Sequence, residues 1–188
     1  KGRPTRSKKT WDSPLILFGG GSLAVLILLG GAMWFFIFRQ TADQQLAQAR
    51  EAAKTGAYPQ AIQQFEEFIN GSPRHPEHSL ARVQLAMLRI RQAAESREFS
   101  QALTLAENEL KAVEDEPAFD NAQDESAALL PQIAEGLAQQ AEQAAPTSDD
   151  SKKYVELANK ALELCNNAKY LPKSFRDETR LINVRDAL

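Results

Sequence analysis

Cysteine and histidine are nearly absent from the chain. Cys165 is the single cysteine, so no disulfide can form within one chain, and packing alone must hold the fold. His75 and His78 are the only histidines. The sequence has no glycine-rich phosphate loop, no Gly-x-Ser-x-Gly, no paired-cysteine motif and no His-Glu-x-x-His. No residue can therefore be assigned a catalytic, cofactor-binding or metal-binding role, and we expect a protein that is not an enzyme and takes no small-molecule substrate.

Positive charge is scarce outside the N-terminal tail. Residues 1–14 carry five Lys or Arg against one Asp, whereas residues 40–188 carry 16 Lys or Arg against 24 Asp or Glu. Binding to nucleic acid requires clustered Lys and Arg to neutralise phosphates, and the acidic region has no such cluster. We therefore expect no nucleic acid partner.

One long stretch lacks charge altogether. Residues 15–38 give 24 apolar or small residues without an ionisable side chain. At about 1.5 Å per residue, a helix of this length covers roughly 36 Å, enough to cross a hydrocarbon core of ~30 Å. Trp11 lies before it and the aromatic cluster 34–38 closes it, as side chains at membrane interfaces do. The sequence predicts a single transmembrane helix over 15–38, embedded in the lipid bilayer.

The flanks of this stretch indicate its orientation. The basic tail, residues 1–14, lies on one side and only Arg39 closes the other, so the positive-inside bias predicts a cytoplasmic N-terminus. Residues 39–188 would then be extracytoplasmic, which means periplasmic in a bacterium. A cleaved signal peptide is the alternative, but its apolar region is typically ~7–15 residues and ends at small residues. This stretch is longer and ends in large aromatic residues, which favours a retained anchor.

The remainder of the chain shows helical periodicity that repeats. The segment from Thr55 to Pro76 aligns with the segment from Ser96 to Pro117 at a shift of 41 residues, and a weaker third copy follows after a further shift of 55. The matched pairs are Tyr58/Phe99, Gln60/Gln101, Ala61/Ala102, Ile62/Leu103, Glu66/Glu107, Ile69/Leu110 and Pro76/Pro117. Apolar residues three and four apart form one buried stripe, and another helix precedes each copy. We expect an all-α fold of stacked helical hairpins, with a last helix over about 173–188 and a kink or a new start at Pro131.

The first copy resembles a tetratricopeptide repeat, a helix-turn-helix unit of about 34 residues. Residues 42–75 match the family's small, Gly, aromatic, Ala, aromatic and Pro positions with Ala49, Gly56, Tyr58, Ala61, Phe65 and Pro73. Gln45 and Phe68 depart from the pattern, since an aromatic and an alanine are usual there. The resemblance implies a TPR-like α-solenoid over 39–188, with units at 42–75, 76–117 and 118–172 and a partial unit at 173–188. A tethered domain of this kind looks like the envelope tetratricopeptide proteins of bacteria that act as assembly factors or chaperones.

Three short motifs could carry chemistry, and each has a simpler structural explanation. His75 and His78 could share a metal ion, but no adequate third ligand is near in sequence, so turn and first-turn positions are favoured. Cys165 aligns with interior repeat positions and is expected to be a small buried side chain rather than a nucleophile. Asn70-Gly71-Ser72 matches a glycosylation acceptor, yet Asn-Gly is also common where a helix ends.

Two groups of residues are candidate binding surfaces. The acidic group could dock a basic partner, although most charge runs are solvated; it comprises Asp115, Glu116, Asp120, Asp124 and Glu125. The aromatic group has the spacing of a buried face, although an exposed subset could form a peptide groove; it comprises Tyr58, Phe65, Phe68 and Phe99.

The sequence predicts a membrane-anchored scaffold, assembly factor or chaperone-like protein that binds protein partners. Because only residues 39–41 separate the apolar stretch from the first repeat, we expect a membrane-associated partner. One alternative is a structural accessory subunit of a larger membrane complex, in which the anchor makes the specific contact. Another is a fragment of a longer protein, since the chain starts with Lys rather than Met.

Overall fold

A computed structural model describes residues 27–30, 33, 41–145 and 148–188. The chain divides into two units, residues 1–43 and residues 44–188, and each is described by itself. Every regular element in the described residues is helical, and none of these residues forms a strand. The expected all-α fold class is therefore confirmed for this part of the chain.

In the first unit, the described residues are 27–30, 33 and 41–43, and all of them are helical. The side chains of Ile27, Leu28, Leu29 and Met33 are 63–72% exposed. The rest of the predicted span 15–38, and the tail 1–14, lie outside the described residues. Within the described ranges, no helix is both long enough and apolar enough to cross a membrane.

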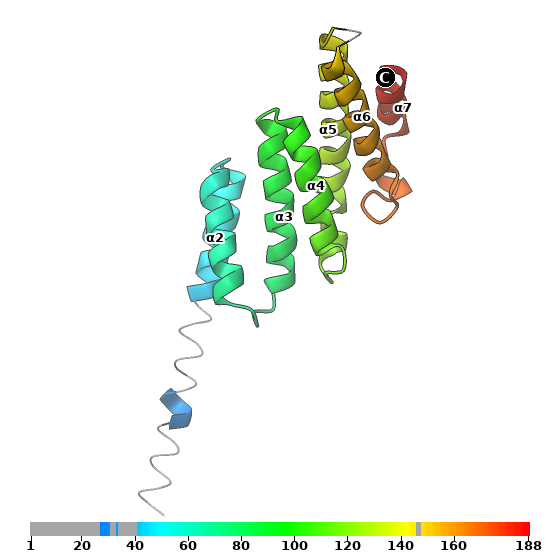
Figure 1. The fold of residues 1–188 in the computed structure, drawn as a ribbon. Coiled ribbons are helices and arrows are strands. Elements are labelled where there is room, and N and C mark those ends of the chain that lie inside the picture. Colours follow the sequence, from blue (N-terminus) through cyan, green and yellow to red (C-terminus); the bar gives the residue numbers. More distant parts are fainter. Residues whose placement is uncertain (1–26, 31–32, 34–40, 146–147) are drawn as a thin grey trace, which may run out of the picture. The chain divides into compact units, whose positions relative to one another are not determined.

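The second unit is a series of helices joined by short turns (Figure 1). Residues 44–54 are helical and open this unit. The helices that follow are α2 (Tyr58–Gly71), α3 (His78–Glu95), α4 (Phe99–Val113), α5 (Gln123–Gln143), α6 (Asp149–Asn166) and α7 (Glu178–Asp186). Two short 3₁₀ turns, η2 (Phe119–Ala122) and η3 (Lys173–Phe175), precede α5 and α7. Helices α3 and α4 pack together as one hairpin and α5 and α6 as the next, and α3, α5 and α7 also contact in that order.

The first two hairpin turns are built alike, 41 residues apart. In the first, the N–H of Ala57 donates to the carbonyl of Ala52 over 2.9 Å, and Gly56 between them has a left-handed φ of 78°. In the second, Glu98 donates to the equivalent carbonyl over 3.0 Å, and Arg97 takes the left-handed φ of 60°. This is the Schellman ending, in which a left-handed residue lets the chain reverse after a helix. The sequence repeat therefore corresponds to a repeat of backbone geometry.

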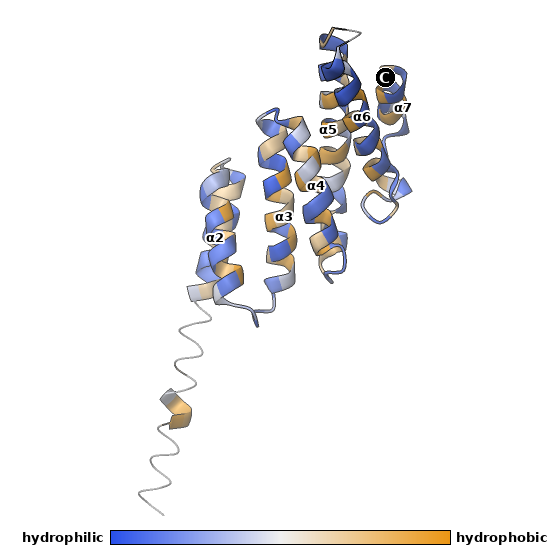
Figure 2. Ribbon diagram, in the orientation of Figure 1, coloured by the Kyte–Doolittle hydropathy of each residue, from blue (hydrophilic) through white to orange (hydrophobic). Residues whose placement is uncertain are grey.

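Small and large apolar residues share the core. Ala61 and Ala102, the matched alanines of the repeat, are fully buried, which allows the helices to approach closely. The larger buried side chains come from the helices of the unit other than α6 and, with Leu171, from the segment after α6: Leu46, Phe65, Phe68, Val83, Met87, Ile90, Leu103, Leu110, Ile133, Leu137, Leu171 and Leu181. Figure 2 shows hydrophilic and hydrophobic residues alternating along these helices, as amphipathic packing requires.

The last predicted helix is too long. A helix over about 173–188 was expected, but α7 spans only Glu178–Asp186. The reason is local, because the carboxylate of Asp177 accepts the N–H of Arg180 at 3.0 Å and caps a helix that begins after it. Residues 173–175 instead form the turn η3.

Pro131 does not interrupt its helix. It lies inside α5, which runs continuously from Gln123 to Gln143, and its ring is buried. The proline removes one backbone hydrogen bond, but the packed hairpin partner α6 and the neighbouring α3 and α4 hold α5 in place. Of the two alternatives expected at Pro131, a kink or a new start, the new start is therefore wrong.

Candidate functional site

The two histidines are not brought together with a further ligand. His75 lies in the α2–α3 connection, where its Nδ1 accepts the N–H of Glu77 at 3.2 Å. Its ring meets Phe68 edge-on, with the centroids 5.0 Å apart. No group of three or more His, Cys, Asp or Glu in the described residues could hold a metal ion. The histidines therefore occupy turn and first-turn positions in this part of the chain.

Cys165 is completely buried near the end of α6. Burial raises the pKa of its thiol to about 12, because an apolar environment disfavours the thiolate. Nucleophilic chemistry requires the thiolate, so at neutral pH this side chain acts as a small apolar residue. The expected burial is confirmed.

Asn70, Gly71 and Ser72 close helix α2. Asn70 and Gly71 are its last two residues, and the N–H of Ser72 donates to the carbonyl of Phe68 over 2.9 Å. The segment thus has the helix-ending role that Asn-Gly favours.

Most of the acidic group is engaged within the protein. Three of its five carboxylates form ion pairs with Arg or Lys from other elements. The pairs are Arg82–Glu116, Arg91–Glu125 at 2.8 Å and Lys169–Asp115 at 3.1 Å. Burial raises the pKa of Glu125, with Arg91 opposing that shift. The cations that pair with these carboxylates lie on distant helices, which a sequence alone cannot reveal.

The aromatic group divides into core residues and contacts between hairpins. Phe65 and Phe68 are buried, as their spacing predicted. Tyr58, the first residue of α2, donates its hydroxyl to Glu95 at the end of α3 over 2.7 Å. Phe99, the first residue of α4, lies against Gly136 of α5, so closely that an added Cβ would be 2.4 Å from the ring. Helices α2 and α4 therefore each start with an aromatic residue that contacts the next hairpin.

Arginines on alternate helices tie the hairpins together. Arg89 of α3 reaches Glu66 of α2 and Glu109 of α4, each over 2.6 Å. Desolvation is the largest single influence on the pKa of Arg89 and lowers it, but the hydrogen bonds to Glu66 and Glu109 and the charges of both glutamates together raise the pKa. Arg180 of α7 holds Glu135 of α5 with two hydrogen bonds. These bonds fix the register between neighbouring helices.

Several grooves open between the described elements, and two of them are named for use below. The first, which we name the turn groove, measures about 620 Å³ and lies between the α3–α4 turn and α5. Its lining is Ala94, Glu95, Arg97, Phe99, Gln132, Glu135, Gly136, Gln139, Gln140 and Gln143. The second, the basic groove, measures about 220 Å³ and is lined by Arg50, Ala53, Lys54, Phe65, Gln84, Leu88, Arg91 and Glu125.

Neither groove was predicted from the sequence. The signal for the turn groove was present, however, because its glutamines recur on one face of α5 and Arg97 replaces the glycine of the preceding turn. Comparisons of the chain with models of known protein families, with curated proteins and with solved structures found no match. The functional conclusion therefore depends on the residues themselves.

Proposed function

We propose that this protein is a membrane-anchored helical-repeat module that binds other proteins, as a scaffold, assembly factor or chaperone on the extracytoplasmic side. The observation that carries the proposal is the serial packing of hairpins, in which each hairpin contacts the next and a groove opens between them. Stacks of this kind offer extended surfaces that suit polypeptide partners.

A TPR-like α-solenoid is the architecture that we propose for residues 39–188. Two observations support it. The matched turns at Gly56 and Arg97 share their hydrogen-bond pattern, and the matched alanines Ala61 and Ala102 are both fully buried. The first helices of successive hairpins, α3, α5 and α7, contact in sequence order, as nearest-neighbour stacking requires.

We propose a membrane anchor because residues 15–38 form a long stretch without charged side chains. The described residues within it fit the proposal, because Ile27, Leu28, Leu29 and Met33 are large apolar side chains of the kind that lipid accommodates. The basic tail 1–14 would remain in the cytoplasm, and residues 39–188 would face the periplasm in a bacterium. Since only residues 39–41 intervene before the first repeat, we propose that the partner is itself associated with the membrane.

Site-specific crosslinking in membranes of the source organism tests this function. A photo-crosslinking amino acid is placed in the full chain at Lys54 in the basic groove or at Gln139 in the turn groove. Asn159, which is exposed on α6, is the control position. We expect a discrete adduct with a membrane-fraction protein from at least one groove position and none from Asn159. Equal background at all three positions would refute the proposed function.

An exchange of the anchor separates this function from an accessory-subunit role. If residues 15–38 are replaced by an unrelated membrane helix, a groove-mediated adduct should persist. Its loss together with loss of assembly would instead indicate that the anchor makes the specific contact.

A further inference from the structure

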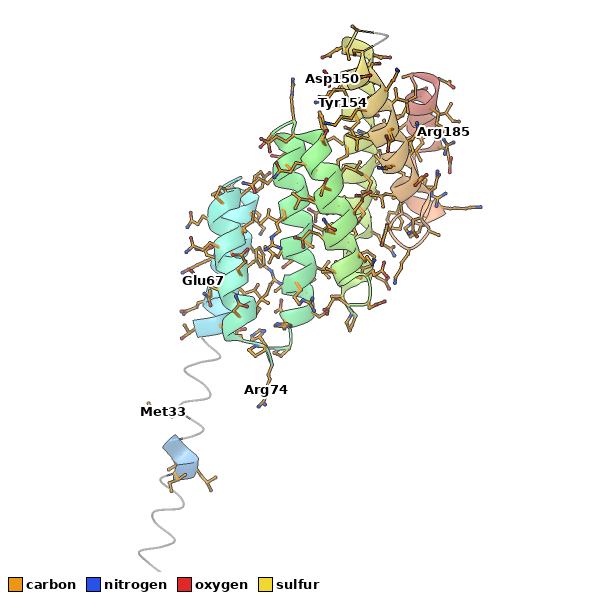
Figure 3. All side chains as sticks on the ribbon, viewed as in Figure 1. Met33, Glu67, Arg74, Asp150, Tyr154 and Arg185 are labelled. Atoms are coloured by element: carbon orange, nitrogen blue, oxygen red, sulfur yellow. The ribbon has the colours of Figure 1, made fainter. Side chains whose placement is uncertain are left out.

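The last two residues of α2 form the single Asn-Gly pair of the chain. Seven asparagines occur in the sequence, and Asn70 is the only one that a glycine follows. Asn70 and Gly71 are both exposed. In the connection that follows, Arg74 points away from the helices (Figure 3). Solvent therefore reaches this end of α2 and the residues after it.

An asparagine side chain next to a glycine is set up for an intramolecular reaction. The backbone nitrogen of Gly71 gives up its proton and attacks Cγ of Asn70. The new N–Cγ bond replaces the Cγ–Nδ2 bond, and the Nδ2 group leaves as ammonia. Glycine favours this attack, because no Cβ crowds its nitrogen and its backbone adopts more conformations than that of any other residue. The product is a five-membered succinimide ring.

Water then opens the succinimide at one of its two carbonyls. Attack at Cγ gives an aspartate with the normal backbone. Attack at the main-chain carbonyl carbon gives an isoaspartate, in which the backbone runs through Cγ and contains an additional methylene group. In both cases the protein consumes one water, releases one ammonia and gains one negative charge.

A regular helix slows the reaction by holding its backbone N–H groups in hydrogen bonds, but the end of α2 is held weakly. Ser72 closes it by donating its N–H to the carbonyl of Phe68 over 2.9 Å. The φ of Ser72 is −133°, so the helix lacks the left-handed residue that closes the turns at Gly56 and Arg97. A Cβ built on Gly71 would meet no described atom within 4 Å, so no neighbour restrains this peptide unit. Terminal turns of this kind open at little cost in free energy.

Other asparagines of the chain lack this combination of features. Asn108 lies inside α4 and is followed by a glutamate. Asn159 lies inside α6, where its Nδ2 donates to the carbonyl of Val155 over 2.9 Å. The Oδ1 of Asn166 accepts a hydrogen bond from Arg185 over 3.1 Å. Asn159 is therefore the matched control within the same chain.

We propose that Asn70 is a site of spontaneous deamidation in the folded protein, which converts it to aspartate or isoaspartate. The new carboxylate lies at the C-terminal end of α2, where the last helical carbonyls carry partial negative charge and repel it. The additional methylene of the isoaspartate also displaces the chain from the Ser72–Phe68 hydrogen bond that closes the helix. The modification therefore loosens the connection between α2 and α3 as the protein ages. This inference goes beyond the proposed function and does not depend on it.

Peptide mapping by mass spectrometry tests the proposal on the full chain in detergent micelles. The protein is incubated at pH 8, folded or unfolded in urea, and digested with pepsin at low pH so that the reaction does not continue after unfolding. We expect the peptide that contains Asn70 to gain the mass difference between NH₂ and OH, while the peptide that contains Asn159 stays unchanged in the folded protein. The folded rate at Asn70 should lie within about tenfold of the unfolded rate, since a terminal turn opens readily. Labelling with an isoaspartate-specific methyltransferase distinguishes the two products.

Variants at the two residues separate this reaction from other changes. Gly71→Ala should abolish the mass gain over the same incubation, and Asn70→Gln should do the same while keeping an amide. Asn70→Asp reproduces the charge of the product and should lower the urea midpoint by about 0.15–0.5 M, whereas Asn70→Gln should not. Circular dichroism verifies that each variant keeps its helices. More than tenfold protection of folded Asn70, an equal mass gain in Gly71→Ala, or an equal gain at Asn159 overturns the site. An unchanged midpoint in Asn70→Asp overturns the loosening of α2.

Discussion

Replacing Arg97 with glycine should make the protein more stable. A left-handed conformation costs an L-residue about 1–2 kcal/mol, and glycine removes that cost. Glycine also gives the unfolded chain more freedom, which opposes the gain by about 0.4–1 kcal/mol. Because the guanidinium of Arg97 has no ion pair among the described residues, little else is lost. The net expectation is a stabilisation of about 0.5–1 kcal/mol.

The reverse change at the equivalent turn is the control. Gly56 has a φ of 78°, and a Cβ added there would meet no described atom within 4 Å. Gly56→Ala therefore introduces backbone strain without a clash. The cost of the left-handed conformation and the freedom of the unfolded chain both apply here with opposite sign. This variant should therefore lose about 0.5–1 kcal/mol of stability.

Urea denaturation of the full chain in detergent micelles, followed by helical circular dichroism, measures both variants. With a denaturant dependence of about 2 kcal/mol/M, the midpoint should rise by roughly 0.25–0.5 M for Arg97→Gly and fall by a similar amount for Gly56→Ala. The slope of the free energy of unfolding against urea concentration should be the same in both variants as in the parent chain. An unchanged or lower midpoint for Arg97→Gly, with the expected fall for Gly56→Ala, would refute the reasoning about strain at Arg97.

Three further changes test other contacts. Gly136→Ala places a Cβ 2.4 Å from the ring of Phe99 and should cost about 1–3 kcal/mol in thermal or urea unfolding, a loss that Phe99→Leu in the same chain should partly recover. Cys165, with a thiol pKa of about 12, should react with iodoacetamide at pH 8 far more slowly in the native protein than in urea; equal rates would contradict its burial. Tyr170 donates a 2.6 Å hydrogen bond to Glu114 and so lowers the pKa of that carboxyl. The stability that this bond contributes is fully present above the unfolded carboxyl pKa of about 4.5 and is lost as the pH falls through the lower folded value. Tyr170→Phe should therefore cost more stability at pH 7 than at pH 3, and an equal loss at both would exclude this linkage.

The helix pairs were predictable because their signals are local. Apolar spacing identified the buried faces, and the repeat identified positions such as Ala61 and Ala102, both of which are fully buried. The end of the chain was harder, since Asp177 starts α7 later than periodicity alone suggested. Capping by a single side chain shifts a helix boundary without changing the apolar pattern.

The contacts between hairpins were not predictable from one sequence. Arg89 contacts Glu66 and Glu109, which lie 23 and 20 residues away, and nothing local to Arg89 indicates either. The acidic group was interpreted as a possible docking face for the same reason, because its cationic partners lie on other elements. Pairing across helices depends on how their faces meet in space, which periodicity does not specify.

The turn groove results from a difference between two equivalent interfaces. A shift of 41 residues carries Gly56 onto Arg97 and Glu95 onto Gly136. Helix α3 ends at Glu95, whereas α5 continues past Gly136 to Gln143 and so supplies three of the groove's four glutamines. The interface between the α3–α4 hairpin and α5 thus has a longer helix beside the turn, Gly136 without a side chain, and Arg97 in a left-handed conformation. The preceding interface has Gly56 at the turn and the Tyr58–Glu95 hydrogen bond.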